Sequence, residues 1–221
     1  MKDTQSYYDQ DYHNLIHGNL LARDDYYWAR AHAFKDLYFS REEQQGKLKV
    51  LDYGCGLGQA SAALEGSWGF DASAQARSVA KQHGMKVLDS LESIPKGEFD
   101  IVICRHVLEH LVDPAVVLKT FHTYLKSDGT LKLILPKEKH RMVSFSPDDH
   151  LHLHAWNFRT INNLLSICGF QVQANQELYH WGFSKLMPVH RLCGKDVYLL
   201  AAKLTGFLFR ASELVIIAKK N

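Results

Sequence analysis

The most constraining feature of this sequence is a short apolar run that leads directly into three alternating glycines. Residues 49–53 have the composition of a buried strand, and Gly54, Gly56 and Gly58 follow at once. Glycine has no Cβ and reaches positive φ without strain, so the backbone can turn tightly there and pass close to a ligand. The alanine-rich segment 59–64 then predicts a helix. A strand, a glycine turn and a helix in this order form the first unit of an α/β fold.

Strand and helix signals alternate through the rest of the chain. Apolar runs predict strands at 68–71, 99–104, 130–135, 170–178 and 213–218. Capping and breaking residues predict helices at 24–39, from Ser73 to Gly84, from Pro114 to about 126, and from Asn157 to Gly169, with a turn at Ser127, Asp128 and Gly129. Alternating strands and helices imply a sheet of parallel strands joined by helical crossovers that cover both faces.

We therefore predict a doubly wound α/β fold with a mostly parallel, seven-stranded sheet in a single domain. Residues 1–46 are expected to form a helical cap, and 47–178 together with 213–221 the core. Residues 179–212 form an insertion between the last two strands, which we expect to cover the substrate. A length of 221 residues suits one such domain.

Composition narrows the possible partners and compartments. The formal charge is only +2, and the 26 basic residues are scattered, so a nucleic-acid partner is not expected. Four cysteines lie far apart without a C-x-x-C pair, which favours a reduced, cytoplasmic setting. No secretion signal is expected, because the first five residues lack a basic region followed by an apolar run. The longest apolar stretch, 197–209, is interrupted by Lys203 and is shorter than the ~20 residues of a membrane span. No integral membrane segment is expected, and the oligomeric state stays open.

An acidic residue ends the second predicted strand. Asp71 could accept hydrogen bonds from both ribose hydroxyls of an adenosine, or it could cap the next helix, a role also open to Ser73. A dinucleotide-binding loop would need a glycine at position 59, where the chain has Gln59, so the loop favours adenosylmethionine over a nicotinamide cofactor. The residues after the third strand are candidates for the adenine contact or belong to an ordinary loop: Asp89, Ser90 and Leu91.

Four segments of the chain form a longer pattern. They are VLDYGCGLG at 50–58, GFDAS at 69–73, FDIVI at 99–103 with VLEHLVDP at 107–114, and LKSDGTL at 125–131. In this order and spacing, over about residues 48–136, the chain resembles the class I S-adenosylmethionine-dependent methyltransferases. The resemblance is to the broad small-molecule group with ubiquinone-biosynthesis and polysaccharide-associated members. The short gap between Gly58 and Asp71 departs from the family pattern and implies a trimmed first helix.

The resemblance implies S-adenosylmethionine as the cofactor and assigns roles to single residues. Gly54, Gly56 and Gly58 would line the methionine part, Asp52 would hold the loop, and Asp71 would bind the ribose. Beyond the fourth strand, Cys104, Arg105 and His106 would face the methyl group or the substrate. The remaining cofactor contacts that we predict are Tyr8, Cys55, Ala72, Asp89, Ser90 and Leu91. Tyr8 would act as part of an aromatic lid with Tyr7 and Tyr12, or these rings simply pack.

Histidines provide the candidate catalytic groups. His150, His152 and His154 alternate with leucines and would share one face of an extended segment. Residues on one face of a strand are ~7 Å apart, which rarely brings three rings around one ion, so no metal is assigned. We predict His106, His150 and His154 as proton acceptors, with solvent-exposed or capping roles as the alternative for the latter two. In the family that the chain resembles, the position of His110 is structural.

Methyl transfer requires little beyond holding an in-line nucleophile about 3 Å from the methyl carbon in a dry pocket. The aromatic start of the insertion predicts a partly apolar acceptor, and its amphipathic stretch, 196–210, has a weakly basic polar face and is expected to pack rather than to touch a membrane. We predict an enzyme that methylates a small molecule, with a hydroxyl of a natural-product, quinone-like or sugar-type substrate favoured. The alternatives are an N-methyltransferase acting on a small amine, a catalytically silent partner subunit that binds S-adenosylmethionine, and a nicotinamide-dependent oxidoreductase.

Overall fold

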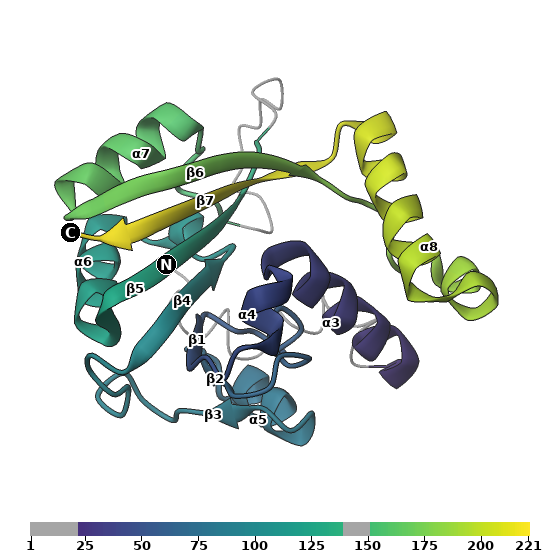
Figure 1. The fold of residues 1–221 in the computed structure, drawn as a ribbon, viewed down its shortest axis with the longest axis horizontal. Coiled ribbons are helices and arrows are strands. Elements are labelled where there is room, and N and C mark those ends of the chain that lie inside the picture. The colour runs from purple at the N-terminus through teal and green to yellow at the C-terminus, as the bar shows by residue number, and fades with distance from the viewer. Residues whose placement is uncertain (1–21, 139–150) are drawn as a thin grey trace.

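A computed structural model describes residues 22–138 and 151–221 of the chain. Its centre is a seven-stranded sheet in the order β3-β2-β1-β4-β5-β7-β6 (Figure 1). The strands are β1 (Val50–Tyr53), β2 (Ser67–Phe70), β3 (Lys86–Val87), β4 (Phe99–Arg105), β5 (Leu125–Pro136), β6 (Phe170–Tyr179) and β7 (Ser212–Lys220). The predicted doubly wound α/β fold and its seven strands are confirmed.

The sheet is parallel except at one strand. β1 pairs in parallel with β2 and β4, and the pairs β2–β3 and β4–β5 are also parallel. β7 runs antiparallel between β5 and β6. The start of β7 therefore lies at the same edge of the sheet as the carboxyl ends of β4 and β5, which is the edge where α/β folds bind ligands.

Helices cover both faces of the sheet. α3 (Asp24–Tyr38) and α8 (Met187–Phe209) bury side chains in one core cluster, which includes Ile101 and Ile103 of β4. α6 (Pro114–Tyr124) and α7 (Phe158–Ile167) pack on the other face, against residues such as Val102. Within residues 22–138 and 151–221 the remaining helices are α4 (Arg41–Gln45), α5 (Ala74–Gln82) and a short 3₁₀ helix η1 (Leu108–His110). In Figure 1, α8 stands at the opposite end of the molecule from α6 and α7.

The helix starts follow the capping residues in the sequence. The Ser73 hydroxyl accepts a hydrogen bond from the Ala76 N–H and begins α5, and the Asn157 side chain caps α7 in the same way. The Asp113 carboxylate accepts bonds from the first N–H groups of α6, which follow Pro114. These predicted helices are confirmed, because each start depends on a local hydrogen bond that the sequence displays.

Two local predictions are wrong. Residues 59–64 form successive turns instead of a helix, since Gly58 has φ of +87° and the Ser61 hydroxyl donates to the carboxylate of Asp52 at 2.7 Å. This buried bond overrides the helix propensity of the alanines. The expected turn at 127–129 lies inside β5 as an irregular stretch, because the register with β4 shifts between Phe99 and Ile101 and leaves residues 126–129 opposite Asp100 alone.

The insertion between β6 and β7 is dominated by α8. This helix is kinked at Gly194, which has φ of +81°, and its second half passes very close to the backbone of His180 at Gly206. Across the described ranges, 22–138 and 151–221, none of the helices is both long enough and apolar enough to span a bilayer.

Candidate cofactor and acceptor site

The glycine turn connects the ends of β1 and β2. The N–H groups of Gly54 and Cys55 both donate to the carbonyl oxygen of Phe70, at 2.7 and 3.0 Å. Gly54, Gly56 and Gly58 all have positive φ, between 53° and 87°. A Cβ at Gly54 would overlap the side chain of Val107, so this position requires glycine on steric as well as conformational grounds.

Asp71 lies directly beside this turn. Its Oδ2 accepts a hydrogen bond from the Gly56 N–H at 2.8 Å, and its Oδ1 accepts one from the Ser73 N–H at 2.9 Å. Because the Ser73 hydroxyl caps α5, Asp71 is not the helix cap that the alternative interpretation required. Arg77 binds the carbonyl oxygens of Asp71 and Ala72, which fixes the backbone between the turn and α5. The carboxylate is thus held where a ribose next to the turn would meet it.

Asp52 provides an open acceptor under the turn. The side chain is fully buried, and Oδ2 accepts the Ser61 hydrogen bond, while Oδ1 has no hydrogen-bond partner among the described residues. Burial raises the pKa of this carboxyl to about 7. A buried oxygen without a partner is costly, and a bound group that donates a hydrogen bond would remove that cost. The site therefore fits a cofactor with a donor or cationic group at this point.

One residue of this region was missed by the sequence reasoning. Tyr27 of α3 is buried, donates from its hydroxyl to the carbonyl oxygen of Leu57 at 2.9 Å, and stacks on His83 with 3.5 Å between ring centroids. Helix α3 of the N-terminal cap thus contacts the glycine turn through the side chain of Tyr27. Tyr8, which the sequence placed in a lid, falls outside the described residues.

The predicted adenine contacts lie at the surface. Asp89 forms an ion pair with Lys81 at 2.7 Å, and Ser90 bonds with Ser93. Leu91 is exposed, whereas Cys55 is buried against the turn. Their contact with a cofactor stays a prediction.

A second group of polar side chains gathers around Glu213, the second residue of β7. Its Oε1 accepts a hydrogen bond from Arg105 Nη2 at 2.6 Å and lies 2.8 Å from His106 Nε2. Its Oε2 accepts a bond from the Tyr38 hydroxyl at 2.6 Å and lies 2.8 Å from His180 Nε2. We call these five residues the Glu213 cluster. It joins the cap, the end of β4, the insertion and β7 at the carboxyl edge of the sheet.

The cluster has a defined charge state. Burial alone would raise the pKa of Glu213, but the neighbouring Arg105 guanidinium holds it well below its usual range. Burial and the neighbouring Arg105 lower the pKa of His106 to about 4, so this imidazole is neutral at pH 7. His106 Nε2 lies 2.8 Å from Glu213 Oε1 without the alignment of a hydrogen bond, and it is buried with no hydrogen-bond partner among the described residues.

Arg105 and Cys104 occupy different surroundings. The Arg105 guanidinium also donates from Nε to the Tyr38 hydroxyl at 3.0 Å and lies over the Phe34 ring. Cys104 points to the opposite face and is fully buried in the apolar core, where burial raises the pKa of its thiol. The structure thus brings Arg105 into the Glu213 cluster, whereas Cys104 faces the core on the other side of the sheet, and their contacts with cofactor or methyl group stay predictions.

A third group lies in η1, just beyond β4. The Glu109 side chain is fully buried, and burial raises its pKa to about 8. Both of its carboxylate oxygens are without a hydrogen-bond partner among the residues described. Glu109, His110 and His152 each offer one ligand atom, and these atoms lie within 4.8 Å of one another. This mixed oxygen and nitrogen set could hold a divalent metal ion, although the sequence had assigned no metal and a structural role to His110.

The other predicted histidines are only partly described. The carbonyl oxygen of Glu109 accepts bonds from the N–H groups of Leu153 and His154, and His154 Nε2 lies 2.8 Å from the Leu111 carbonyl oxygen. This segment is therefore tied to η1, next to the carboxyl edge of the sheet. His150 is outside the described ranges.

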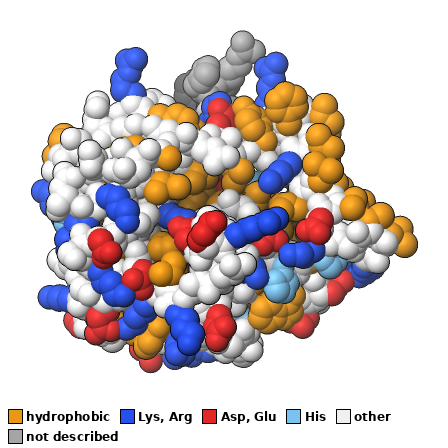
Figure 2. Space-filling model, in the orientation of Figure 1, with side chains coloured by type: hydrophobic (Ala, Val, Ile, Leu, Met, Phe, Trp, Pro, Cys, Tyr) orange, Lys and Arg blue, Asp and Glu red, His pale blue; other side chains and the backbone are white. Residues whose placement is uncertain are grey.

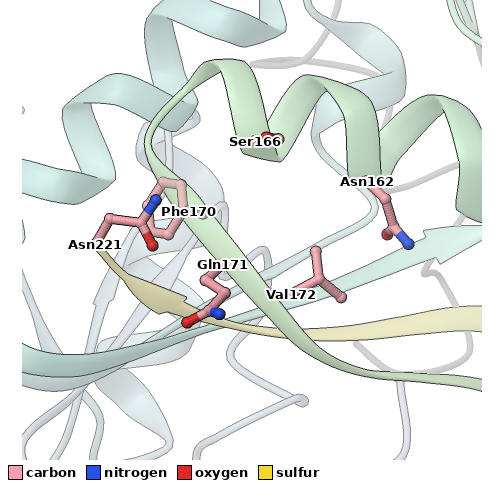
Figure 3. A pocket seen from close by; sticks show the side chains of 6 residues that line it. All are labelled: Asn162, Ser166, Phe170, Gln171, Val172 and Asn221. Carbon is pink, nitrogen blue, oxygen red and sulfur yellow. The ribbon is translucent and has the colours of Figure 1, made fainter.

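An open pocket of about 400 Å³ lies elsewhere (Figure 3). It is formed where α7 meets the first residues of β6, at the sheet edge opposite to the glycine turn. Its lining residues are Asn162, Ser166, Phe170, Gln171, Val172 and Asn221. None of their side chains is titratable, so the pocket offers no side-chain acid or base for catalysis.

Comparisons with known proteins agree with this geometry. A family model described as a methyltransferase domain matches residues 21–175. Among curated proteins, a ubiquinone biosynthesis O-methyltransferase of Glaesserella parasuis is 35% identical over 101 residues, which are 38% of this chain and 43% of that protein. The corresponding protein of Pseudomonas aeruginosa is 30% identical over 131 residues, 48% of this chain and 56% of its own length. The chain thus spans about half the length of these curated relatives.

Solved structures match nearly the whole chain. A Haloferax volcanii putative methyltransferase, in complex with its Trm112 activator, has a TM-score of 0.63 at 17% identity and covers 96% of this chain and 98% of its own. A Burkholderia thailandensis 1,6-didemethyltoxoflavin-N1-methyltransferase with bound S-adenosylhomocysteine has a TM-score of 0.61 at 18% identity, covering 98% and 87%. These likenesses show the fold. With the family match over residues 21–175, they establish that the chain belongs to the class I methyltransferase domain family, whose cofactor is S-adenosylmethionine.

Proposed function

We propose that this chain transfers the methyl group of S-adenosylmethionine to a hydroxyl of a small, partly apolar molecule. The observation that carries the proposal is the glycine turn flanked by two carboxylates, Asp52 with an open buried oxygen and Asp71 beside the loop. Curated relatives named O-methyltransferases support oxygen as the acceptor atom.

The cofactor, when bound, supplies an electrophilic methyl group on a sulfonium. The chain's own contribution is binding and orientation. Asp71 would exchange its bond with the Gly56 N–H for the ribose hydroxyls, and the Asp52 oxygen would accept a donor from the amino-acid part. Fixing both ends of the cofactor points the methyl group toward the acceptor, which is the main source of rate in a displacement of this kind.

His106 is the candidate proton acceptor. Its imidazole is neutral at pH 7, and its buried Nε2 has no hydrogen-bond partner among the described residues, so one ring nitrogen is available to accept a proton. A proton taken from the acceptor hydroxyl by the unprotonated ring nitrogen would give an imidazolium whose charge Glu213, 2.8 Å from Nε2, would stabilise. The low pKa of about 4 makes it a weak base, which suits an acidic hydroxyl such as a phenol better than a sugar alcohol.

The test is release of S-adenosylhomocysteine from the full chain with matched acceptors: catechols, sugar alcohols and small amines. The proposal expects turnover with phenolic hydroxyls and a loss of about 100-fold in kcat for His106→Gln, in the range typical of general-base removal. Turnover with amines alone would replace the O-methyltransferase assignment by an N-methyltransferase one. Binding of the cofactor without turnover by any acceptor would favour a silent subunit.

A further inference from the structure

The outer face of the second half of α8 is apolar and uncovered. Val197, Leu200, Leu204, Phe207 and Leu208 follow each other at steps of three, four, three and one residues, so they lie on one side of the helix. Their exposed fractions range from 46% to 74%. We call these five residues the α8 stripe. Figure 2 shows hydrophobic side chains along the margin of the molecule where Figure 1 places α8.

The opposite face of the same helix is also apolar, and it is buried. Tyr198, Ala202 and Gly206 pack against the body of the protein, and Gly206 touches the backbone of His180. An apolar helix face as wide as this is normally covered by other parts of a protein. The sequence analysis expected packing to account for this segment, but packing covers only one face. The stripe is larger than the isolated apolar residues that ordinary surfaces carry.

Positive charge and a tryptophan surround the stripe. Lys185, Lys203 and Arg210 are exposed, and none of the three forms an ion pair with another described residue. The sequence from Val197 to Phe209 contains no acidic residue. The Trp181 ring is exposed and lies 4.9 Å from the Phe209 ring, with Lys185 Nζ 4.9 Å from its centre. Apolar side chains bordered by tryptophan and lysine are typical of helices that lie in the headgroup region of a bilayer.

This charge pattern distinguishes lipid from a second copy of the chain. The exposed Asp196 is the one acidic residue of α8 beside the stripe, against Lys185, Lys203 and Arg210, so a two-fold dimer through the stripe would bring more positive than negative charge together. An anionic lipid surface complements the border. We propose that the α8 stripe and Trp181 bind the interface of an anionic membrane. His180 of the Glu213 cluster directly precedes Trp181, so docking would bring the candidate acceptor site next to the bilayer.

Sedimentation of the full chain with vesicles tests this proposal. Vesicles of phosphatidylcholine and phosphatidylglycerol should bind the protein about tenfold more tightly than vesicles of phosphatidylcholine alone. The double substitution Leu204→Glu with Phe207→Glu should abolish binding, since two charges would replace the inserted side chains. Lys203→Ala should weaken it by about fivefold, the effect of one surface lysine on an anionic bilayer.

The matched control places glutamates on exposed apolar residues of other helices, Val116→Glu in α6 with Ile167→Glu in α7. These should leave vesicle binding unchanged, and circular dichroism should show all variants folded. The proposal is overturned if the wild-type chain binds neither vesicle type. It is also overturned if the control double variant loses as much binding as the α8 double variant. A dimer in analytical ultracentrifugation that the double substitution Leu204→Glu with Phe207→Glu dissociates would also overturn the proposal, if neither the dimer nor the monomer binds vesicles.

Discussion

Glu109 and Glu213 are both buried at the carboxyl edge of the sheet, yet their surroundings are opposite. Glu213 is bonded by Arg105 and Tyr38 and faces two imidazoles, and its pKa is held well below the usual range. Glu109 has no side-chain hydrogen-bond partner in the described part of the chain, and its pKa is raised to about 8. The difference shows that charged and hydrogen-bonding neighbours, and not the extent of burial, decide whether a buried carboxylate is charged. Substitutions at the two positions should therefore act differently.

The largest effect is expected at Glu213. Glu213→Leu leaves the Arg105 guanidinium buried without its counter-charge, and it should lower the free energy of unfolding at pH 7 by about 5 kcal/mol. Urea titration measures this. Because the pKa of Glu213 is depressed in the folded state, its contribution is present above pH 4.5 and is lost as the pH falls below that value, so the gap between wild type and variant should narrow in acid.

Glu98 gives the matched control for this substitution. It forms an exposed ion pair with Lys49, and Glu98→Leu should cost less than about 1 kcal/mol. A Glu213→Leu variant as stable as the Glu98 variant would contradict the assignment of Glu213 as a charged, bonded partner.

The next effect concerns Glu109 and has the opposite dependence on pH. Its folded-state pKa of about 8 exceeds the ordinary 4.5, so the stability of the wild type should fall as the pH rises between these values. Asp52, with a pKa raised to about 7, acts in the same direction. Glu109→Gln removes the contribution of Glu109 to this pH dependence. Between pH 5 and pH 9 the free energy of unfolding of the variant should therefore fall by as much as about 4 kcal/mol less than that of the wild type. Thermal or urea unfolding across pH measures this.

Glu65 is exposed, so Glu65→Gln serves as the control. Its free energy of unfolding, plotted against pH, should run parallel to that of the wild type. If the free energy of unfolding of Glu109→Gln has the same pH dependence as that of the wild type, Glu109 is ionised in the folded chain. That result would instead support a bound cation at Glu109, His110 and His152.

The smallest effect is expected at His180, one of several partners of Glu213. His180→Phe keeps an aromatic ring next to Phe34 and Phe183 but removes the contact with Glu213 Oε2. The loss should be about 2 kcal/mol at pH 7, the value of one hydrogen bond to a charged group. Phe183→Leu, which preserves the contact, is the control. An unchanged unfolding midpoint for His180→Phe would show that the other partners suffice for Glu213.

The two halves of the candidate site differ in how far the sequence predicts them. The glycine turn and Asp71 directly follow the neighbouring strands β1 and β2, whose register pairs Asp52 with Gly69, so their meeting follows from local order in the sequence. The Glu213 cluster joins residues that are distant in the sequence, such as Tyr38 and Glu213, and no local sequence pattern predicts such contacts. A single acidic residue at the start of the apolar strand at 213–218 is the one signal that could have drawn attention to it.

Local prediction also failed where a tertiary contact opposed propensity. The helix expected at 59–64 is replaced by turns because Ser61 bonds the buried Asp52. The α8 stripe was assigned to packing because a sequence does not show which of two apolar faces is covered. Capping residues, by contrast, predicted the starts of α5, α6 and α7 correctly, since their bonds span only two or three residues.

Calorimetric titration with S-adenosylhomocysteine tests the central claim most directly, namely that the turn and Asp71 hold the cofactor. The wild type should bind, and Asp71→Ala should bind about 100-fold more weakly because two bonds to a carboxylate are lost. Ser73→Ala, which removes the helix cap beside Asp71, controls for local destabilisation and should keep its affinity. Equal affinity of wild type and Asp71→Ala, or binding of NADH in place of S-adenosylhomocysteine, would contradict the account.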